Sequence, residues 1–506
     1  MKPTIFVRDD TGRHAWEETN HDAQITYQDG KLYIQAEEST IRKIELVWSC
    51  QITPEDLILG DAWERGYGEL SWHKPKNGEI LPWYFLAQTG EENQCFGVKT
   101  QPNAMCYWQI LPDSVMLTAD ISCGNAPVRL GGRRLLVCEV VMAVIPEDSF
   151  AAAQKFCTML CPNPRLPQQP IFGGNDWYCN YGHNSYEKII EHTKRIVSCS
   201  PAGRKPYMVV DDGWQLCHHQ KGGEAVFFNG GPWKYCNREF GDMKRLAEEI
   251  TVLGAIPGIW FRPLWTVEQF PDEYCLKYNG IKYTLDPSVP EVLDIVREDV
   301  TCLRNWGYKL IKHDFSSFDV FERWGGDAEH YLSTQAQFHD RSRTTAEIIK
   351  DFYAAIREAA GDGVLIIGCN TLSHLSAGFF ELQRTGDDTS GVEWSRTRKM
   401  GINTLAFRMP QHRAFYLCDA DCVGITKQIP WRLNRQWLDV LSKSGTPLFV
   451  SIARDAFTPE VEANVREAFA RASIPADPAQ PLDWMETDTP TRWQSAWGTT
   501  EYDWNE

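Results

Sequence analysis

Polar residues that could bind or transform a ligand rich in hydroxyl groups follow six apolar runs in the second part of the chain. They are Asn175-Asp176-Trp177, Asp211-Asp212, Lys312-His313-Asp314, Cys369-Asn370, Arg384 to Asp388 and Asp419-Ala420-Asp421. Carboxylates accept hydrogen bonds from hydroxyl groups, Lys and Arg donate them, and Trp offers a flat apolar face. Hydrolysis of a glycosidic bond needs two carboxyl groups that flank this bond. Asp314 and Asp387 follow the fourth and sixth apolar runs, so they are candidates for such a pair.

The elements that carry these residues alternate between strand-like and helical patterns. The eight apolar runs lie within residues 171–177, 207–214, 255–263, 308–315, 364–369, 382–388, 414–421 and 447–452. Eight strand–helix units over about 300 residues predict a (β/α)₈ TIM barrel, in which the carboxyl ends of the strands converge on one mouth. A doubly wound open sheet is the alternative, because the period of a pattern does not show whether the sheet closes.

The N-terminal part has a different pattern. Short alternating or apolar runs such as KLYIQAE and IRKIELVW, separated by Gly, Asn, Asp and Pro, predict an antiparallel β-sandwich. The segment CPNPRLPQQP has four Pro in ten residues, which indicates a linker. We therefore expect a multidomain protein with all-β and α/β parts. Its parts are an N-terminal β-sandwich (1–160), a Pro-rich linker (161–170), a catalytic (β/α)₈ barrel (171–475) and a C-terminal tail (476–506).

The composition narrows the class of ligand. The chain of 506 residues has 51 basic and 68 acidic residues and a formal net charge of −17. This balance disfavours nucleic acid and anionic membrane surfaces as partners. The chain has no apolar run long enough for a transmembrane helix, and its polar start predicts no secretory signal. The 20 Trp residues fit a large aromatic core and, with about equal weight, clefts whose flat faces bind sugar rings.

The 16 cysteines are scattered along the chain. Many lie within apolar runs, such as Cys138 in LLVCEVVMAV, where a free cysteine acts as a small hydrophobic residue. This usage favours a reducing, cytoplasmic compartment. The CxxxC pairs Cys157/Cys161 and Cys418/Cys422 have no matching second pair, so we expect no metal and no cofactor.

Several segments together resemble the α-galactosidases and related enzymes of glycoside hydrolase family 36, in the clan shared with families 27 and 31. The segments are VVDDGWQ (209–215), PGIWFRP (257–263), TLDPSVPEV (284–292), LIKHDF (310–315), IIGC (366–369), QRTGDD (383–388) and DADCVG (419–424). Their joint order and spacing make the resemblance specific. It implies hydrolysis of terminal α-galactosides with retention, through a covalent glycosyl-aspartate intermediate and without a metal.

The resemblance also implies roles for single residues. Asp314 matches the nucleophile and Asp387 the acid/base, with the adjacent Asp388 as the alternative. Lys312 matches a lysine that contacts sugar hydroxyls, and we expect its charge to favour the ionised form of Asp314. The remaining substrate-binding set comprises Trp177 and Trp260 as aromatic subsite walls, Asp211 and Asp212 for the 4- and 6-hydroxyl groups, Cys369 and Arg384 near the 2-hydroxyl group, and Asn370, Asp388 and Asp421.

Three segments depart from the pattern of the family. GGNDW lacks the second Trp or Ser of relatives, Arg262 stands where many members have Glu, and Asn370-Thr371 replaces smaller residues after Cys369. These departures leave the identity of the sugar open. The alternatives are an α-N-acetylgalactosaminidase, a transglycosylase similar to raffinose synthases, a glucose-type substrate as in family 31, and a sugar-binding protein without catalysis. The expected partner is an α-linked oligosaccharide or glycoconjugate, and the sequence leaves a homo-oligomer open.

Overall fold

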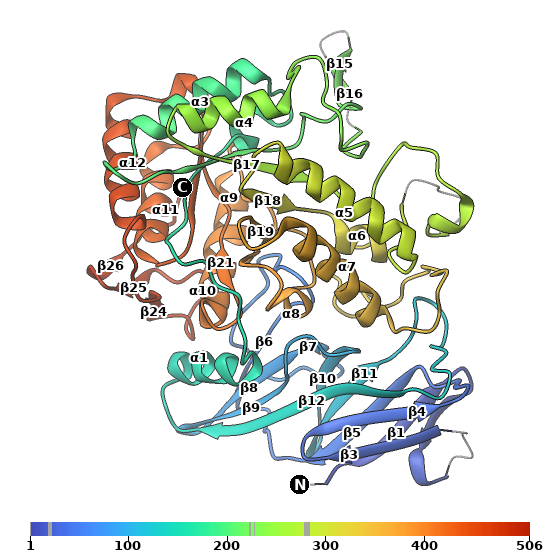
Figure 1. The fold of residues 1–506 in the computed structure, drawn as a ribbon. Coiled ribbons are helices and arrows are strands. Elements are labelled where there is room, and N and C mark those ends of the chain that lie inside the picture. The colour runs from blue at the N-terminus through green and yellow to red at the C-terminus, as the bar shows by residue number, and fades with distance from the viewer. Residues whose placement is uncertain (1, 19–22, 222–223, 227, 278–283) are drawn as a thin grey trace.

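The computed structural model describes residues 2–18, 23–221, 224–226, 228–277 and 284–506. Figure 1 shows a layer of antiparallel strands from the N-terminal part of the chain beneath a barrel formed by the rest. The carboxyl-terminal segment lies against the side of the barrel. The chain therefore has the two predicted architectures in the predicted order.

The N-terminal part is a sandwich of two six-stranded sheets, with strand orders β2-β1-β5-β11-β10-β7 and β3-β4-β12-β9-β8-β6. The strands are β1 (Thr4–Asp9), β2 (Gly12–Ala15), β3 (Ala23–Gln28), β4 (Lys31–Ala36), β5 (Lys43–Ser49), β6 (Leu57–Gly60), β7 (Leu81–Pro82), β8 (Tyr84–Thr89), β9 (Glu92–Val98), β10 (Met105–Leu111), β11 (Ser114–Asp120) and β12 (Arg134–Ile145). In β4, Leu32, Ile34 and Ala36 are buried and alternate with more exposed residues. This period of two places one face of the strand in the core between the sheets.

Helix α1 (Ser149–Leu160) leads from the sandwich to the barrel. Asp148 caps it by accepting hydrogen bonds from the backbone N–H groups of Phe150 and Ala151, which have no partner within the helix. The Pro-rich segment 161–170 follows, outside any helix or strand. It delivers the chain to the first barrel strand.

The barrel sheet is parallel and closed. Its strands are β13 (Phe172–Asn175), β14 (Tyr207–Val210), β17 (Ile256–Phe261), β18 (Leu310–His313), β19 (Leu365–Gly368), β20 (Leu382–Arg384), β21 (Leu417–Asp419), β22 (Cys422–Ile425) and β23 (Leu448–Ile452). Each barrel strand up to β20 pairs with the next in chain order, and β23 pairs back with β13. β21 pairs with β20 and β22 with β23, so the seventh strand is two short pieces joined at Ala420 and Asp421. The predicted sandwich and (β/α)₈ barrel are confirmed.

Helices surround this sheet (Figure 1). They are α3 (Tyr186–Ser198), α4 (Met243–Val252), α5 (Pro290–Asn305), α7 (Thr345–Ala360), α11 (Trp431–Lys443) and α12 (Pro459–Ala472), with the shorter α2 (Trp177–Asn180), α6 (Ser316–Phe321), α8 (Ser373–Ser376), α9 (Trp394–Thr397) and α10 (Thr404–Arg408). A small hairpin, β15 (His219–Lys221) and β16 (Glu224–Val226), projects from the loop after β14. A capping box at Thr344 and Glu347 begins α7.

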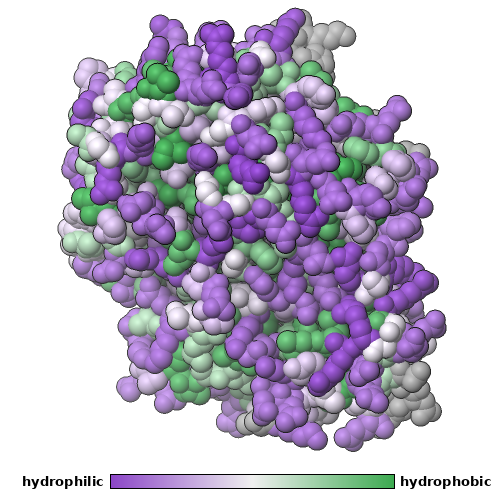
Figure 2. Space-filling view, in the orientation of Figure 1, coloured by the Kyte–Doolittle hydropathy of each residue, from purple (hydrophilic) through white to green (hydrophobic). Residues whose placement is uncertain are grey.

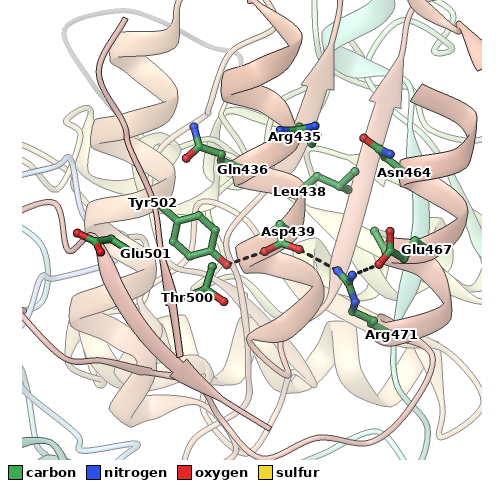
Figure 3. Close-up of a pocket in the computed structure, with 11 residues that line it drawn as sticks. Arg435, Gln436, Leu438, Asp439, Asn464, Glu467, Arg471, Thr500, Glu501 and Tyr502 are labelled. Atoms are coloured by element: carbon green, nitrogen blue, oxygen red, sulfur yellow. Dashed lines mark hydrogen bonds and ion pairs between the residues drawn. The ribbon is translucent and has the colours of Figure 1, made fainter. Parts of the chain in front are cut away.

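The C-terminal residues form a three-stranded antiparallel sheet that packs beside α11 and α12. Its strands are β24 (Gln480–Pro481), β25 (Arg492–Ser495) and β26 (Gly498–Glu501). Figure 3 shows Tyr502 and Arg471 pointing toward Asp439 of α11. Tyr502 Oη donates to Asp439 Oδ2 at 2.9 Å, and Arg471 Nη1 donates to Asp439 Oδ1 at 2.8 Å. The first bond ties the tail to α11 and the second joins α12 to α11, on the border of a cavity between α11, α12 and β26.

Candidate active site

Asp314 follows β18 and is held by two hydrogen bonds. The indole Nε1 of Trp260 donates to Asp314 Oδ2 at 2.9 Å, and the backbone N–H of Phe315 donates to Oδ1 at 2.8 Å. Phe315 has a φ of 62°, a left-handed conformation that is uncommon for an aromatic residue. The turn after β18 therefore holds one oxygen and Trp260 of β17 holds the other oxygen of the carboxylate that the sequence singled out as the nucleophile.

Lys312 lies two residues earlier on β18 and directs its ammonium group to Asp211. The Nζ atom is 2.8 Å from Asp211 Oδ2, and the amide of Asn175 donates to the same oxygen at 2.5 Å. Burial by itself lowers the pKa of Lys312, but the carboxylates of Asp211 and Asp314 outweigh it and raise the pKa well above its usual value. Lys312 therefore stays charged between the ends of β14 and β18.

Asp212, the neighbour of Asp211, accepts a hydrogen bond from Gln215 Nε2 at 2.5 Å on its Oδ1 atom. Its Oδ2 atom has no hydrogen-bond partner in the described part of the chain. Burial raises the pKa of Asp212 against the Gln215 bond, and the charges of Asp211 and Asp314 raise it further, to about 7. This free oxygen can accept a hydrogen bond from a ligand hydroxyl when the group is ionised.

Asp387 and Asp388, after β20, have different surroundings. Both oxygens of Asp387 are in ion pairs, with Arg65 Nη2 at 2.7 Å and with Arg396 Nη2 at 2.6 Å. Asp388 has one ion pair, with Arg384 Nη2 at 3.2 Å, and its side chain is 38% exposed. Burial opposes the ionised form of Asp388, but Arg384, Arg65 and other cations lower its pKa to about 2.

Arg384, Cys369 and Asp421, three residues of the predicted substrate-binding set, form one buried group. Arg384 Nη1 lies 3.2 Å from the Cys369 sulfur, and Nη2 lies 3.0 Å from Asp421 Oδ2. Asp421 also accepts from the backbone N–H of Thr389 at 2.9 Å and from the hydroxyl of Tyr178. Burial raises the pKa of the Cys369 thiol well above its usual value, so the group is a neutral neighbour of the cations.

Two residues of the expected substrate set are buried and bonded to other residues of the protein. Trp260 is 1% exposed and offers no open ring face; its described role is the hydrogen bond to Asp314. Asn370 is fully buried and donates through Nδ2 to Glu64 Oε2 at 2.8 Å. Trp177, by contrast, is partly exposed at the start of α2 and packs edge to face with Tyr181. Of the two predicted aromatic walls, Trp177 has a partly exposed ring and Trp260 does not.

The sequence reasoning missed residues that come from outside the strand ends. Arg65 and Glu64 belong to the segment after β6 of the sandwich, and Arg396 belongs to α9. Asn175 was noted at its strand end, but its bond to Asp211 was not expected. No local pattern marks Arg65 or Glu64, because they lie in a loop more than three hundred positions from Asp387. The only available signal is the concentration of charge and glycine in WERGYGE.

In the described part of the chain, neither a metal site nor a membrane-spanning helix accompanies these residues. Among the described residues, no group of three or more His, Cys, Asp and Glu side chains is arranged to hold a metal ion. Within the same residues, no helix is long and apolar enough to cross a membrane. The face in Figure 2 is largely hydrophilic, with apolar side chains scattered over it.

The fold and the site define a class of protein: a closed (β/α)₈ barrel with a mouth rich in carboxylates, preceded by a β-sandwich that reaches the mouth. No model of a known protein family matches the chain. Solved structures of α-galactosidases share the fold over nearly its whole length. TtGalA from Thermus thermophilus, solved with p-nitrophenyl α-D-galactopyranoside, is 16% identical, with a TM-score of 0.63 over 98% of this chain and 97% of that one. The family 36 enzyme AgaA from Geobacillus stearothermophilus, solved as its A355E variant with 1-deoxygalactonojirimycin, is 13% identical, with a TM-score of 0.64 over 98% and 80%.

Proposed function

We propose that this protein is a retaining α-glycosidase that hydrolyses terminal α-galactosides. One observation carries the proposal: Lys312 Nζ lies 2.8 Å from Asp211 Oδ2, two residues before Asp314, and its charge is one of those that lower the pKa of Asp388. The candidate sugar-binding carboxylate Asp211, the candidate nucleophile Asp314 and the candidate proton donor Asp388 therefore lie in one cluster of charges around Lys312. The similar α-galactosidases, solved in complex with a galactoside and with 1-deoxygalactonojirimycin, support the same reaction.

In the proposed reaction, Asp314 attacks the anomeric carbon and the bond to the leaving oxygen breaks as that oxygen receives a proton. Water then attacks the glycosyl–Asp314 ester, and the same acid/base group takes its proton. The hydrogen bonds from Trp260 and Phe315 hold Asp314 in one orientation before the sugar arrives. Asp211, Asp212 and Lys312 bind the hydroxyl groups of the sugar.

The proton donor belongs to the pair Asp387–Asp388. Asp387 stays the prediction from the sequence, but its contacts favour Asp388 for this role. Protonation of Asp387 would break ion pairs on both of its oxygens, whereas Asp388 has one pair and a partly exposed side chain. In the free protein Asp388 is ionised, so the bound sugar has to raise its pKa before it donates a proton.

The test is turnover of an aryl α-galactoside by Asp314→Ala. We expect turnover to fall by at least about 10³-fold, because the covalent intermediate cannot form. Azide or formate should restore part of it by taking the place of the missing carboxylate. Asp439→Ala serves as the comparison, because Asp439 contacts Tyr502 and Arg471 on the outside of the barrel. Full activity of Asp314→Ala would contradict the proposal.

The choice of sugar and acceptor remains part of the proposal. A panel of aryl α-glycosides separates galactose from N-acetylgalactosamine and glucose. An added galactoside acceptor separates hydrolysis from transfer, and binding of free sugars without turnover would identify a non-catalytic protein. A cytoplasmic location and a homo-oligomer stay predictions, which fractionation of the native cells and light scattering would test.

A further inference from the structure

A segment of the sandwich, residues 61–66, follows β6 and enters the mouth of the barrel. Its Gly66 forms a parallel bridge with Gly386 after β20. The backbone N–H of Gly66 donates to the carbonyl of Thr385 at 2.8 Å, and the N–H of Asp387 donates to the carbonyl of Gly66 at 2.9 Å. Backbone hydrogen bonds therefore join this loop of the sandwich to the segment after β20 that contains the candidate acids.

Glu64 is fully buried in this segment and accepts several hydrogen bonds. Its donors are Asn370 Nδ2 at 2.8 Å, the Gly325 N–H at 3.0 Å, Tyr331 Oη at 3.3 Å and the hydroxyls of Ser317 and Tyr67. Ser317 belongs to α6, the helix that begins two residues after Asp314. Glu64 thus joins the segment after the candidate nucleophile to the end of β19.

Arg65 directs its guanidinium group to Asp387, in the segment after β20. Its side chain is 5% exposed, its Nη2 is 2.7 Å from Asp387 Oδ1, and its Nη1 is 3.8 Å from the Cys369 sulfur. Its guanidinium carbon lies 5.2 Å from the centre of the Trp324 ring. The charge of Arg65 is also one of those that lower the pKa of Asp388. Neighbouring residues of one loop therefore contact Asp387 and the helix that follows Asp314.

We propose that Glu64 and Arg65 are positioning residues of the active site, so that the sandwich and the barrel work as one catalytic unit. The inference rests on the proposed function and assigns a task to the sandwich. Glu64 holds the turn that orients Asp314, and Arg65 holds Asp387 in place beside Asp388. A displacement of a reacting group by about 1 Å can cost about 10²-fold in rate, so loss of either contact should be visible in kcat.

Glu64→Gln tests the first contact, with Glu45→Gln as its matched control. Glu45 is another buried glutamate of the sandwich, but its partners Arg8 and Arg13 lie within the sandwich. The amide group that Glu64→Gln introduces presents hydrogens to donors, so we expect kcat to fall about 10- to 100-fold with KM nearly unchanged. The control should lower the melting temperature without a comparable loss of kcat. Equal kcat losses in the two variants would overturn the role of Glu64.

Arg65→Met and Arg65→Lys test the second contact through the pH profile of kcat. Removal of the charge should shift the limb that reports Asp388 to higher pH, because one of the cations that lower its pKa is lost. Arg65→Lys keeps a charge and should recover part of kcat and of the profile. A lower melting temperature with an unchanged profile and unchanged kcat would reduce Arg65 to a structural residue and overturn the inference. Wild type and Asp314→Ala are measured in parallel to test the proposed function itself. A wild-type protein that turns over no α-glycoside would contradict the proposed function, independently of the roles of Glu64 and Arg65.

Discussion

Lys312 Nζ lies 2.8 Å from Asp211 Oδ2, so the lysine of the Lys-His-Asp segment bridges two strand ends of the barrel. Both side chains are buried, and Asn175 supplies the second donor to the same oxygen. The pair joins the end of β14 to the end of β18, the strand that Asp314 follows.

Lys312→Met should damage both stability and catalysis. It leaves the buried charge of Asp211 without its cation, which costs about 3–5 kcal/mol of the free energy of unfolding. It also removes the proposed donor to the sugar, so kcat/KM for an aryl α-galactoside should fall by at least about 10²-fold. Chemical denaturation and initial rates measure the two effects. The double variant Lys312→Met/Asp211→Asn should recover stability but not activity, and recovery of both would contradict the sugar-binding role.

Trp260→Phe should lower kcat without opening the site. The change removes the N–H that donates to Asp314 Oδ2 and keeps most of the buried aromatic volume. A hydrogen bond to a charged group contributes about 1.5–3 kcal/mol, so we expect kcat to fall about 10- to 100-fold. Trp108→Phe is the control, because the Trp108 indole donates to a carbonyl within the sandwich at 3.2 Å. A similar kcat in Trp260→Phe and wild type would show that this bond does not orient the nucleophile.

Asp387→Asn and Asp388→Asn should separate the two candidate acids. If Asp388 is the acid/base, Asp388→Asn should still cleave substrates with an acidic phenol as leaving group but lose about 10³-fold or more with a sugar leaving group. Azide should then speed release of the glycosyl enzyme and give an α-configured glycosyl azide. Asp387→Asn should slow both substrates to a similar degree, without rescue by azide. The reverse pattern would assign the proton transfer to Asp387.

Asp212→Asn should change how stability depends on pH. The pKa of Asp212 in the folded protein is about 7, above its value in the unfolded chain, so the folded state binds this proton more tightly. The stabilisation is complete at pH below the unfolded pKa and is lost as pH rises toward 7. The asparagine of Asp212→Asn stays neutral. The free energy of unfolding of this variant should therefore increase relative to that of wild type as pH rises over this range, by about 1.4 kcal/mol for each unit of pKa shift. Denaturation curves at several pH values measure the difference, and a constant difference would refute the assignment.

Ionisation of Asp212 should strengthen sugar binding, although it weakens the stability of the folded protein. Asp212 accepts a hydroxyl hydrogen better when it is ionised, so the affinity of wild type for galactose should rise as pH increases through about 7, and the affinity of Asp212→Asn should not. Calorimetric titration measures both.

The sequence was sufficient for the order of strands and helices because the patterns that mark them are local. Alternation in the first part and eight apolar runs in the second are consequences of which side chains must be buried, and each is visible within a few residues of the chain. Closure of the barrel was not visible. It depends on the seventh strand, where Asp421 adopts a φ of 69° and splits the strand so that one piece pairs with β20 and the other with β23.

The candidate site divides in the same way. The sequence determined which strand-end residues, from Asp211 to Asp421, gather at the mouth, because the strand ends of a barrel converge. Their partners were decided by the tertiary structure alone. Lys312 contacts Asp211, and Arg65 and Arg396 pair with Asp387. No local pattern in the sequence predicts that these segments meet. A side chain finds its charge partner only after packing has set which loops meet, and here the packing of the sandwich on the barrel brings Glu64 and Arg65 to the mouth.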